Sequence, residues 1–350
     1  MMKFSTSAFA LIIFLVALVS ACESDSGDTS TGSECEPAGE CMDPALFEEG
    51  SLESPITVVD CTLVDGTKTS CYKVAIAGLP TNHETGPYCP TTVDDGPEAG
   101  GKWPTKDGFS DVDGAFIMNL PEFYGDDGWD MWDPVTRLVK RVESAEDCEG
   151  AAAGGSGELG YTNICIDCSV DALGGPVVNV NLIPVKPKMA EQITELEFVS
   201  PGVALNGVRI AFPAGLDAIL ASYQIAALDD CGGHTNNADG YHYHESAGCA
   251  LEVEQSDGHA PLIGYARDGY GIYAMTNSEG VEPADLDECR GHTDAIRGFH
   301  YHAASAGENA FIGCFRGVLV EDGDDLSSGV PGTGGGAPPG GGGGPGGPPE

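Results

Sequence analysis

Short apolar runs separated by turn residues dominate the chain between residues 55 and 320. Ile56–Cys61 and Cys71–Ile76 are rich in β-branched or apolar residues, and Val178–Leu182 alternates apolar and polar positions. Such runs, bounded by turn residues, are typical of β-strands. The pattern predicts a mainly β fold, in a single loop-rich domain that contains little helix.

Two longer segments have the pattern of β-hairpins. Val203–Ile210 contains an Asn-Gly pair, and Leu262–Ala266 and Gly271–Met275 flank an Asp-Gly pair. Both dipeptides favour the tight turns that join antiparallel strands. We therefore predict two strand pairs in the second half of the chain.

Helical periodicity is scarce. Ala214–Leu228 has apolar residues at the spacing of one helix face and is the one helix that we predict. Residues 84–175 show little periodicity and are expected to form long loops held by cysteines. Within them, Asp107, Asp111 and Asp113 do not match the twelve-residue calcium loop, so we interpret them as a solvated acidic loop.

The N-terminus has the features of an export signal. Lys3 precedes an apolar run, Phe9–Val19, that is too short for a stable membrane span. The following Ser-Ala-Cys22 resembles a bacterial lipobox, in which the cysteine becomes a lipidated N-terminus. A simple secretory signal with a free Cys22 is the alternative. By resemblance to lipoprotein sorting signals, Glu23 favours the outer membrane, so we expect a lipid-anchored protein of the bacterial cell envelope.

Composition divides the chain into four parts. Residues 1–21 form the lipoprotein signal peptide, and residues 22–54 begin with a Ser/Thr/Gly-rich stretch expected to be a flexible tether. The β-rich domain is predicted over 55–320. Residues 321–350 are mostly Gly and Pro and are expected to be disordered, because they cannot bury enough apolar area to fold.

Cysteine usage agrees with export. The chain has 13 cysteines, and setting Cys22 aside leaves an even number, enough for up to six disulfides in an oxidising compartment. Cys165 and Cys168 have the spacing of a redox pair. Since no thioredoxin-like pattern surrounds them, we expect one structural disulfide or two separate ones.

The charge balance restricts the partners. Lys and Arg number 15 against 55 Asp and Glu, which gives a formal net charge of -40. Phosphate-bearing partners would be repelled, so we predict no nucleic acid and contact with a membrane through the lipid anchor only. The imbalance is compatible with metal cations as partners, and equally with a solvated acidic surface.

A histidine phrase occurs twice. Both copies follow the pattern C-x2-H-x7-H-x-H, 58 residues apart, and together they hold six of the eight histidines. Imidazole is the commonest metal ligand in proteins. The members of the two phrases are Cys231, His234, His242 and His244 in the first, and Cys289, His292, His300 and His302 in the second.

The spacing suggests how these imidazoles meet. Residues i and i+2 of a strand share a face, so His242 and His244 would point the same way, as would the matching pair in the second copy. A turn could fold the remaining histidine of each copy back toward its pair. This predicts two three-histidine sites or one shared site, with copper or zinc as the ion. A hydrogen-bonded polar core without metal is the alternative.

The cysteines of the phrases could be thiolate ligands. In an oxidising compartment they are more often disulfide partners. Cys249 and Cys314, which follow the two copies, are the natural candidates to pair with Cys231 and Cys289.

Further motifs resemble those of the YHYH domain family, named for a string that is present here at residues 241–244. The similarity extends over six segments in the expected order: Gly78–Pro87, Gly202–Val208, His259–Tyr273, Asp285–Cys289, Gly298–His302 and Ile312–Gly317. The resemblance implies an exported domain, often lipid-anchored and often with a Gly/Pro tail. It supplies no reaction, because the family is of unknown function. It also brings His83 and His259 into family motifs, so both could join the histidine cluster.

We therefore expect an extracytoplasmic lipoprotein that binds a transition metal. The expected ligands are His242, His244, His300 and His302, then His234 and His292, with His83 and His259 added by the resemblance.

The alternatives are a metal-dependent hydrolase or oxidase, or a surface or adhesion module whose histidines are structural. For an enzyme, the candidate bases are Glu84, Glu245 and Glu288, and the candidate proton donors are Tyr243 and Tyr301. Asp239, Asp268, Asp287 and Glu288 are candidates to fix the imidazole tautomers.

Overall fold

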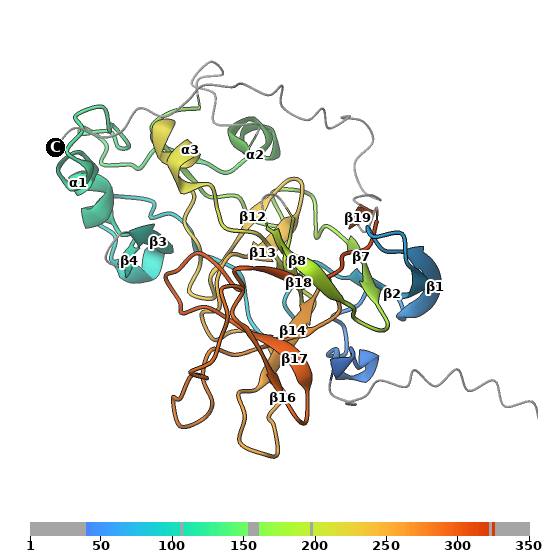
Figure 1. Cartoon of the computed structure of the whole chain (residues 1–350). Coiled ribbons are helices and arrows are strands. Elements are labelled where there is room, and N and C mark those ends of the chain that lie inside the picture. The colour runs from blue at the N-terminus through green and yellow to red at the C-terminus, as the bar shows by residue number, and fades with distance from the viewer. Residues whose placement is uncertain (1–39, 106–107, 153–160, 197–198, 322–323, 326–350) are drawn as a thin grey trace, which may run out of the picture. The chain divides into compact units, whose positions relative to one another are not determined.

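Figure 1 presents the computed structural model of the chain, which describes residues 40–105, 108–152, 161–196, 199–321 and 324–325. The expected signal peptide, the lipidation site Cys22 and most of the Gly/Pro-rich tail lie outside these residues. Among the helices of the described ranges, none has the length and apolar character needed to cross a membrane.

The predicted mainly β fold is confirmed. Its largest sheet has eight strands, and both histidine phrases lie in it. In spatial order the strands are β12 (Gly233–Asn236), β13 (Gly240–Tyr243), β10 (Arg209–Ile210), β9 (Gly202–Ala204), β14 (Leu262–Ala266), β15 (Gly271–Tyr273), β17 (Gly298–His302) and β16 (Gly291–Asp294).

This sheet is built from two matching halves. In the first half, β12 and β13 form an antiparallel hairpin, β13 pairs parallel with β10, and β10 pairs antiparallel with β9. In the second half, β16 and β17 form the hairpin, β17 pairs parallel with β15, and β15 pairs antiparallel with β14. The halves meet where β9 and β14 pair antiparallel. Figure 1 shows β12 and β13 toward one end, β14 between, and β16 and β17 toward the other end. The sequence repeat is thus a structural repeat, with an approximate two-fold relation about the β9/β14 junction.

The predicted turns join the central strands of each half. β9 and β10 flank Asn206-Gly207, β14 and β15 flank Asp268-Gly269, and both glycines have positive φ, +86° and +99°. Glycine adopts this left-handed conformation without a Cβ clash. The two predicted hairpins are confirmed.

The strand register places both H-x-H pairs on one face of the sheet. Arg209 pairs with His242 and with Val203, and Val203 pairs with Tyr265 across the junction. Paired residues share a face. The same face continues to the second pair, because Tyr265 pairs with Gly271, Tyr273 lies two residues further on, and Tyr273 pairs with His302. The alternate residues, including Tyr243 and Tyr301, enter the large apolar core on the opposite face.

Smaller sheets surround this one. They are β1–β2–β7–β19, β11–β6–β5, β18–β8 and β3–β4. Their strands are β1 (Thr57–Thr62), β2 (Lys68–Ile76), β3 (Lys102–Thr105), β4 (Gly108–Asp111), β5 (Arg141–Val142), β6 (Ile164–Ile166), β7 (Asn179–Pro184), β8 (Met189–Glu195), β11 (Gln224–Ile225), β18 (Cys314–Gly317) and β19 (Asp324–Asp325). β1, β2 and β7 confirm the strands predicted over residues 56–61, 71–76 and 178–182.

The structure differs from the expected boundaries at both ends of the domain. Met42 and Phe47, inside the expected tether, are buried in a core cluster with Val203 and Tyr265, so the folded part already includes residues 40–54. Inside the expected tail, β19 pairs with β7. Apolar side chains at the first end and backbone pairing at the second extend the folded part beyond residues 55–320.

The helix predictions were partly wrong. The predicted helix over 214–228 is limited to α3 (Leu216–Ala221), because Tyr223 takes a positive φ of 51° and β11 follows. Residues 84–175 are not all loop, since they contain α1 (Gly114–Tyr124) and α2 (Ala145–Ala152).

The start of α1 explains part of the acidic loop. The Asp113 side chain accepts the backbone N–H of Phe116 at 2.7 Å and so caps the helix, while Asp111 forms an ion pair with Lys102. Asp107 lies outside the described residues.

Five disulfides lie within the described ranges: Cys61–Cys71, Cys89–Cys165, Cys148–Cys168, Cys231–Cys249 and Cys289–Cys314. Cys41 is disulfide-bonded as well. Cys165 and Cys168 belong to two separate bridges, and the cysteines of the histidine phrases pair with those that follow them. Both predictions are confirmed.

Candidate metal centres

The first histidine phrase forms a compact group, here called cluster A: His234 on β12, His242 on β13 and His244 just after β13. His244 Nε2 lies 3.1 Å from Nε2 of His242 and 3.1 Å from Nε2 of His234. His234 and His242 face each other across the hairpin, because they are register partners. Alternation along β13 brings His244 to the same side.

The other nitrogen of each ring in cluster A faces a backbone oxygen. His242 Nδ1 lies 3.0 Å from the Gly240 carbonyl and His244 Nδ1 lies 2.7 Å from the Phe212 carbonyl. His234 is hydrogen-bonded to the backbone of Ala226. Since a carbonyl oxygen accepts only, the ring nitrogens must donate, and this fixes the tautomer of each neutral imidazole.

The second phrase forms a larger group, here called cluster B: His259, His292, His300 and His302. His292 Nε2 lies 2.9 Å from that of His300 and 3.2 Å from that of His302, and His300 Nε2 lies 3.0 Å from that of His259. His259 lies in the segment before β14 and is 41 residues from His300 in sequence. The sheet, rather than the local spacing, brings this fourth imidazole into the cluster.

The Nδ1 atoms of cluster B also face oxygens. His300, His302 and His259 donate to the backbone carbonyls of residues 298, 274 and 260 at 3.1, 2.8 and 2.9 Å. His292 differs, because its Nδ1 lies 2.9 Å from a carboxylate oxygen of Asp285, whose side chain is 72% exposed. A carboxylate behind a ligating imidazole raises its basicity and fixes its orientation.

These contacts leave Nε2 lone pairs facing each other in both clusters. A neutral imidazole has one donor and one acceptor nitrogen. With Nδ1 donating outward, every Nε2 is an acceptor and has no proton to share with its neighbours. A cation at their common centre would satisfy all of them.

The distances suit a metal ion. Two nitrogens bound to one zinc ion at about 2.0–2.1 Å with a tetrahedral angle stand about 3.3 Å apart. The Nε2–Nε2 contacts of 2.9 to 3.2 Å are close to that value. In each cluster the ligand atoms all lie within 4.8 Å of one another, so each cluster could hold a metal ion.

Burial keeps the imidazoles in the form that binds metal. It lowers the pKa of His244 to about 4, of His300 to about 4 and of His302 to about 3. Burial also lowers the pKa of His234 and His242 well below the usual value, and neighbouring imidazoles lower both further. These five rings are therefore neutral at physiological pH, as metal binding requires.

The turns that introduce the two clusters are built alike. Asp229 accepts the backbone N–H groups of Cys231 and Gly233, and Asp287 accepts those of Cys289 and Gly291. Each carboxylate holds the tight turn that leads from the disulfide to the first histidine. Asp287, which we expected to fix an imidazole tautomer, instead holds this backbone turn. Asp285 contacts the imidazole of His292 in its place.

The remaining candidate residues lie away from the Nε2 centres. Tyr243 and Tyr301 are buried on the opposite face of the sheet, and Asp268 accepts the Tyr301 hydroxyl there. Asp239 faces the guanidinium of Arg209, with 3.3 Å between Oδ1 and Nη1.

Of the candidate bases, Glu245 accepts the backbone N–H of Gly307 at 3.1 Å, and burial raises its pKa to about 7. Glu288 is exposed, and the backbone oxygen of Glu84 contacts His83. These contacts do not direct any of the three carboxylates toward an Nε2 centre.

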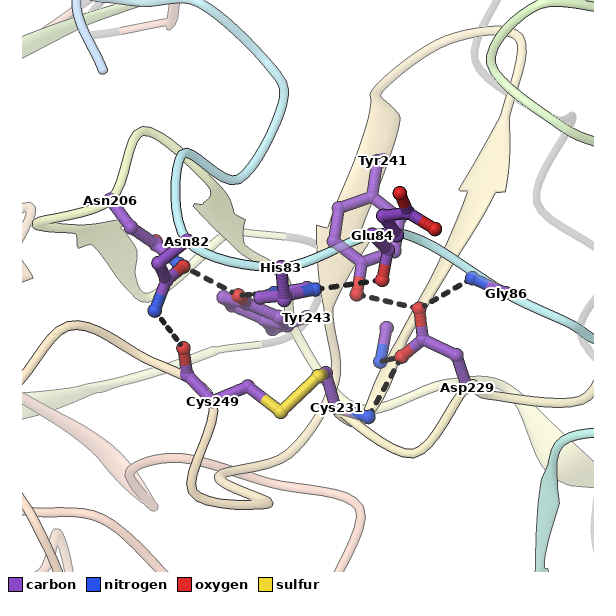
Figure 2. The surroundings of a disulfide bond; sticks show 11 residues. Asn82, His83, Glu84, Gly86, Asn206, Asp229, Cys231, Tyr241, Tyr243 and Cys249 are labelled. Atoms are coloured by element: carbon purple, nitrogen blue, oxygen red, sulfur yellow. Dashed lines mark hydrogen bonds between the residues drawn. A yellow bond between two sulfur atoms is a disulfide. The ribbon is translucent and has the colours of Figure 1, made fainter. Parts of the chain in front are cut away.

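His83 is the one predicted ligand that the structure places outside both clusters. Figure 2 shows it beside Tyr243 and the Cys231–Cys249 disulfide. Its Nε2 lies 2.6 Å from the Tyr243 hydroxyl, and its Nδ1 lies 3.0 Å from the Glu84 carbonyl. Because Tyr243 points to the face opposite His242 and His244, His83 buttresses the back of the strand that carries them.

The two clusters are separate sites. β13 and β17, which carry His242 and His300, have four strands between them in the sheet. Five strand spacings of about 4.8 Å put the clusters on the order of 20 Å apart. One ion cannot bridge them, so of the two predicted arrangements the structure has two sites, the second enlarged by His259.

Comparison with known proteins finds a family match for one segment of the chain. Residues 181–283 match the model of the YHYH protein family. The matched segment includes all of cluster A and His259, and it ends before the other three histidines of cluster B. No curated protein and no solved structure gives a match. The expected resemblance is confirmed for this segment, and it brings no reaction with it.

Proposed function

We propose that the protein binds two transition-metal ions, one in cluster A and one in cluster B. The observation that carries the proposal is the convergence of seven Nε2 acceptors in two groups, with the opposite ring nitrogens hydrogen-bonded to oxygens. A polar core without metal would be expected to alternate donors with acceptors. Here lone pair faces lone pair, which favours a bound cation.

The donor set favours copper or zinc. Imidazole nitrogens suit these ions, whereas calcium and magnesium prefer oxygen ligands. The phrase cysteines are in disulfides and supply no thiolate. His83 is omitted from the proposed ligands because its ring contacts Tyr243 instead.

The test is metal content after purification without a histidine tag. Zinc or copper should bind at two ions per chain. His234→Ala combined with His244→Ala, and His292→Ala combined with His302→Ala, remove matching members of the two clusters, and each double variant should lose one ion and keep the other. A protein that stays metal-free with copper, zinc and iron would refute the proposal, as would single-cluster variants that retain both ions.

We further propose that the domain is exported and lipid-anchored through Cys22. The lipobox-like sequence and the five disulfides support this, because disulfides persist in oxidising compartments. Labelling of cells with a radioactive fatty acid should mark the protein, and Cys22→Ala should abolish the label. An unlabelled wild-type protein would contradict the anchor without affecting the metal proposal.

A further inference from the structure

The two clusters differ in the number of ligands that they offer. Cluster A has three imidazoles and cluster B has four. Within the part of the chain that the structure describes, no carboxylate or thiol completes either group. A tetrahedral ion would have all its positions filled in cluster B and would keep one position open in cluster A.

They also differ in the groups that lie directly behind the imidazoles. In cluster B the carboxylate of Asp285 lies behind His292 and offsets part of the charge of a divalent ion. In cluster A the three Nδ1 atoms face backbone carbonyls, which are neutral. The guanidinium of Arg209 lies on the next strand, on the same face as His242, and it is itself paired with Asp239.

Burial increases the energetic effect of having no carboxylate behind the imidazoles of cluster A. His242 is 1% exposed and His244 is 5% exposed, so an ion at cluster A would lie at an enclosed site. A divalent charge held by neutral ligands alone is costly to desolvate, and an anionic ligand reduces that cost. His234 has intermediate exposure and is the least buried of the three imidazoles, so a small molecule would approach the ion from its side.

From these differences we infer that cluster A is the site at which a small anion binds the metal, while the metal of cluster B is coordinatively complete. The inference rests on the proposed metal binding. The ligand class is a small anionic oxygen or nitrogen donor, such as hydroxide or azide, that occupies the fourth position. Cluster B then acts as a structural or storage site.

The two halves of the sheet supply a matched test. In cluster B, His259→Ala would leave His292, His300 and His302. Each of these lies 58 residues after its counterpart in cluster A. This variant should turn the closed site into an open one. For the converse, His234→Ala combined with His244→Ala removes cluster A.

The experiment is titration of the Co(II)-loaded protein with azide, followed by visible absorption. The wild type should bind two Co(II) ions, and azide should change the spectrum of one. The variant that lacks cluster A should bind one ion with no azide response. Adding His259→Ala to it should restore a response, and His259→Ala alone should double the azide-sensitive amplitude of the wild type.

The failures can be told apart. If no variant and no wild-type protein binds Co(II), the metal proposal itself fails. If Co(II) binds but azide alters neither site, or alters the wild-type cluster B, the inference about cluster A is overturned and the metal proposal stands. Should the variant without cluster A not fold, His259→Ala alone decides, because an unchanged azide-sensitive amplitude would refute the inference.

Discussion

Replacing Asp268 with asparagine should make the stability of the protein less dependent on pH. Asp268 is fully buried behind the second half of the sheet, where it accepts the Tyr301 hydroxyl and the backbone N–H of Gly317, the latter at 2.9 Å. Burial raises the pKa of Asp268 from 3.8 to about 6. The matching position in the first half is Asn206, whose amide contacts the hydroxyl of Tyr243.

The sign and size follow from that pKa. Because the folded protein holds the proton more tightly than the unfolded chain, the contribution of Asp268 to stability is fully present below pH 3.8. It is lost as the pH rises through about 6. A difference of about two pKa units corresponds to about 3 kcal/mol. As the pH rises from 3.8 to 7, the free energy of unfolding of Asp268→Asn should therefore increase by about 3 kcal/mol relative to that of the wild type.

Urea unfolding in the presence of a chelator, with disulfides intact, measures this difference. The free energies of unfolding of wild type and Asp268→Asn should be compared at pH 4 and pH 7. Asn206→Asp is the matched control and should move the other way, because it buries a new carboxyl. If the difference between Asp268→Asn and wild type is the same at both pH values, the reasoning about the buried carboxyl is wrong.

Three further predictions concern other parts of the molecule. Asp285→Asn should weaken metal binding at cluster B about tenfold, measured by competition with a chromophoric chelator, and leave cluster A unchanged. Removing the Cys231–Cys249 disulfide by a double alanine substitution should cost about 3 kcal/mol in urea unfolding, since it closes a loop with a sequence separation of 18. Gly207→Ala should destabilise by more than Gly66→Ala: both glycines have φ near +85°, but only at Gly207 would a Cβ meet a backbone oxygen at 2.5 Å. Equal losses of stability for the two alanine variants would contradict the clash.

The H-x-H spacing was sufficient to predict most of each cluster. Period-two alternation separates His242 and His244 from Tyr243 in any strand, so the sequence predicts their common face. The position of His259 needed the fold, because its contact with His300 depends on the pairing of β14 with β15 and of β15 with β17.

The resemblance treated His83 and His259 alike, yet only one joins a cluster. His83 approaches the sheet from the other face and meets Tyr243. A sequence motif shows that a histidine is present, but it does not show which face of the sheet that histidine contacts. The sequence predicted a carboxylate partner for the imidazoles in the acidic segment before Cys289, but not that this partner is Asp285. Several carboxylates lie in that segment, and their spacing does not show which one reaches His292.

The helix errors have local causes. α1 contains Pro121 and begins at a glycine, which obscured a helix that Asp113 caps and whose buried face includes Phe116 and Leu120. α3 ends early because Ile225 is buried in a strand that pairs with β6, and this tertiary contact outweighs the helical periodicity.

The outermost strands of the eight-stranded sheet are β12 and β16, and each contributes one histidine, His234 or His292, to a cluster completed by inner strands. A metal ion bound in either cluster would therefore hold an edge strand of the sheet against the inner strands. Exposed margins are where separate chains join into aggregates. Metal supply would then also govern how readily copies of this protein adhere to one another.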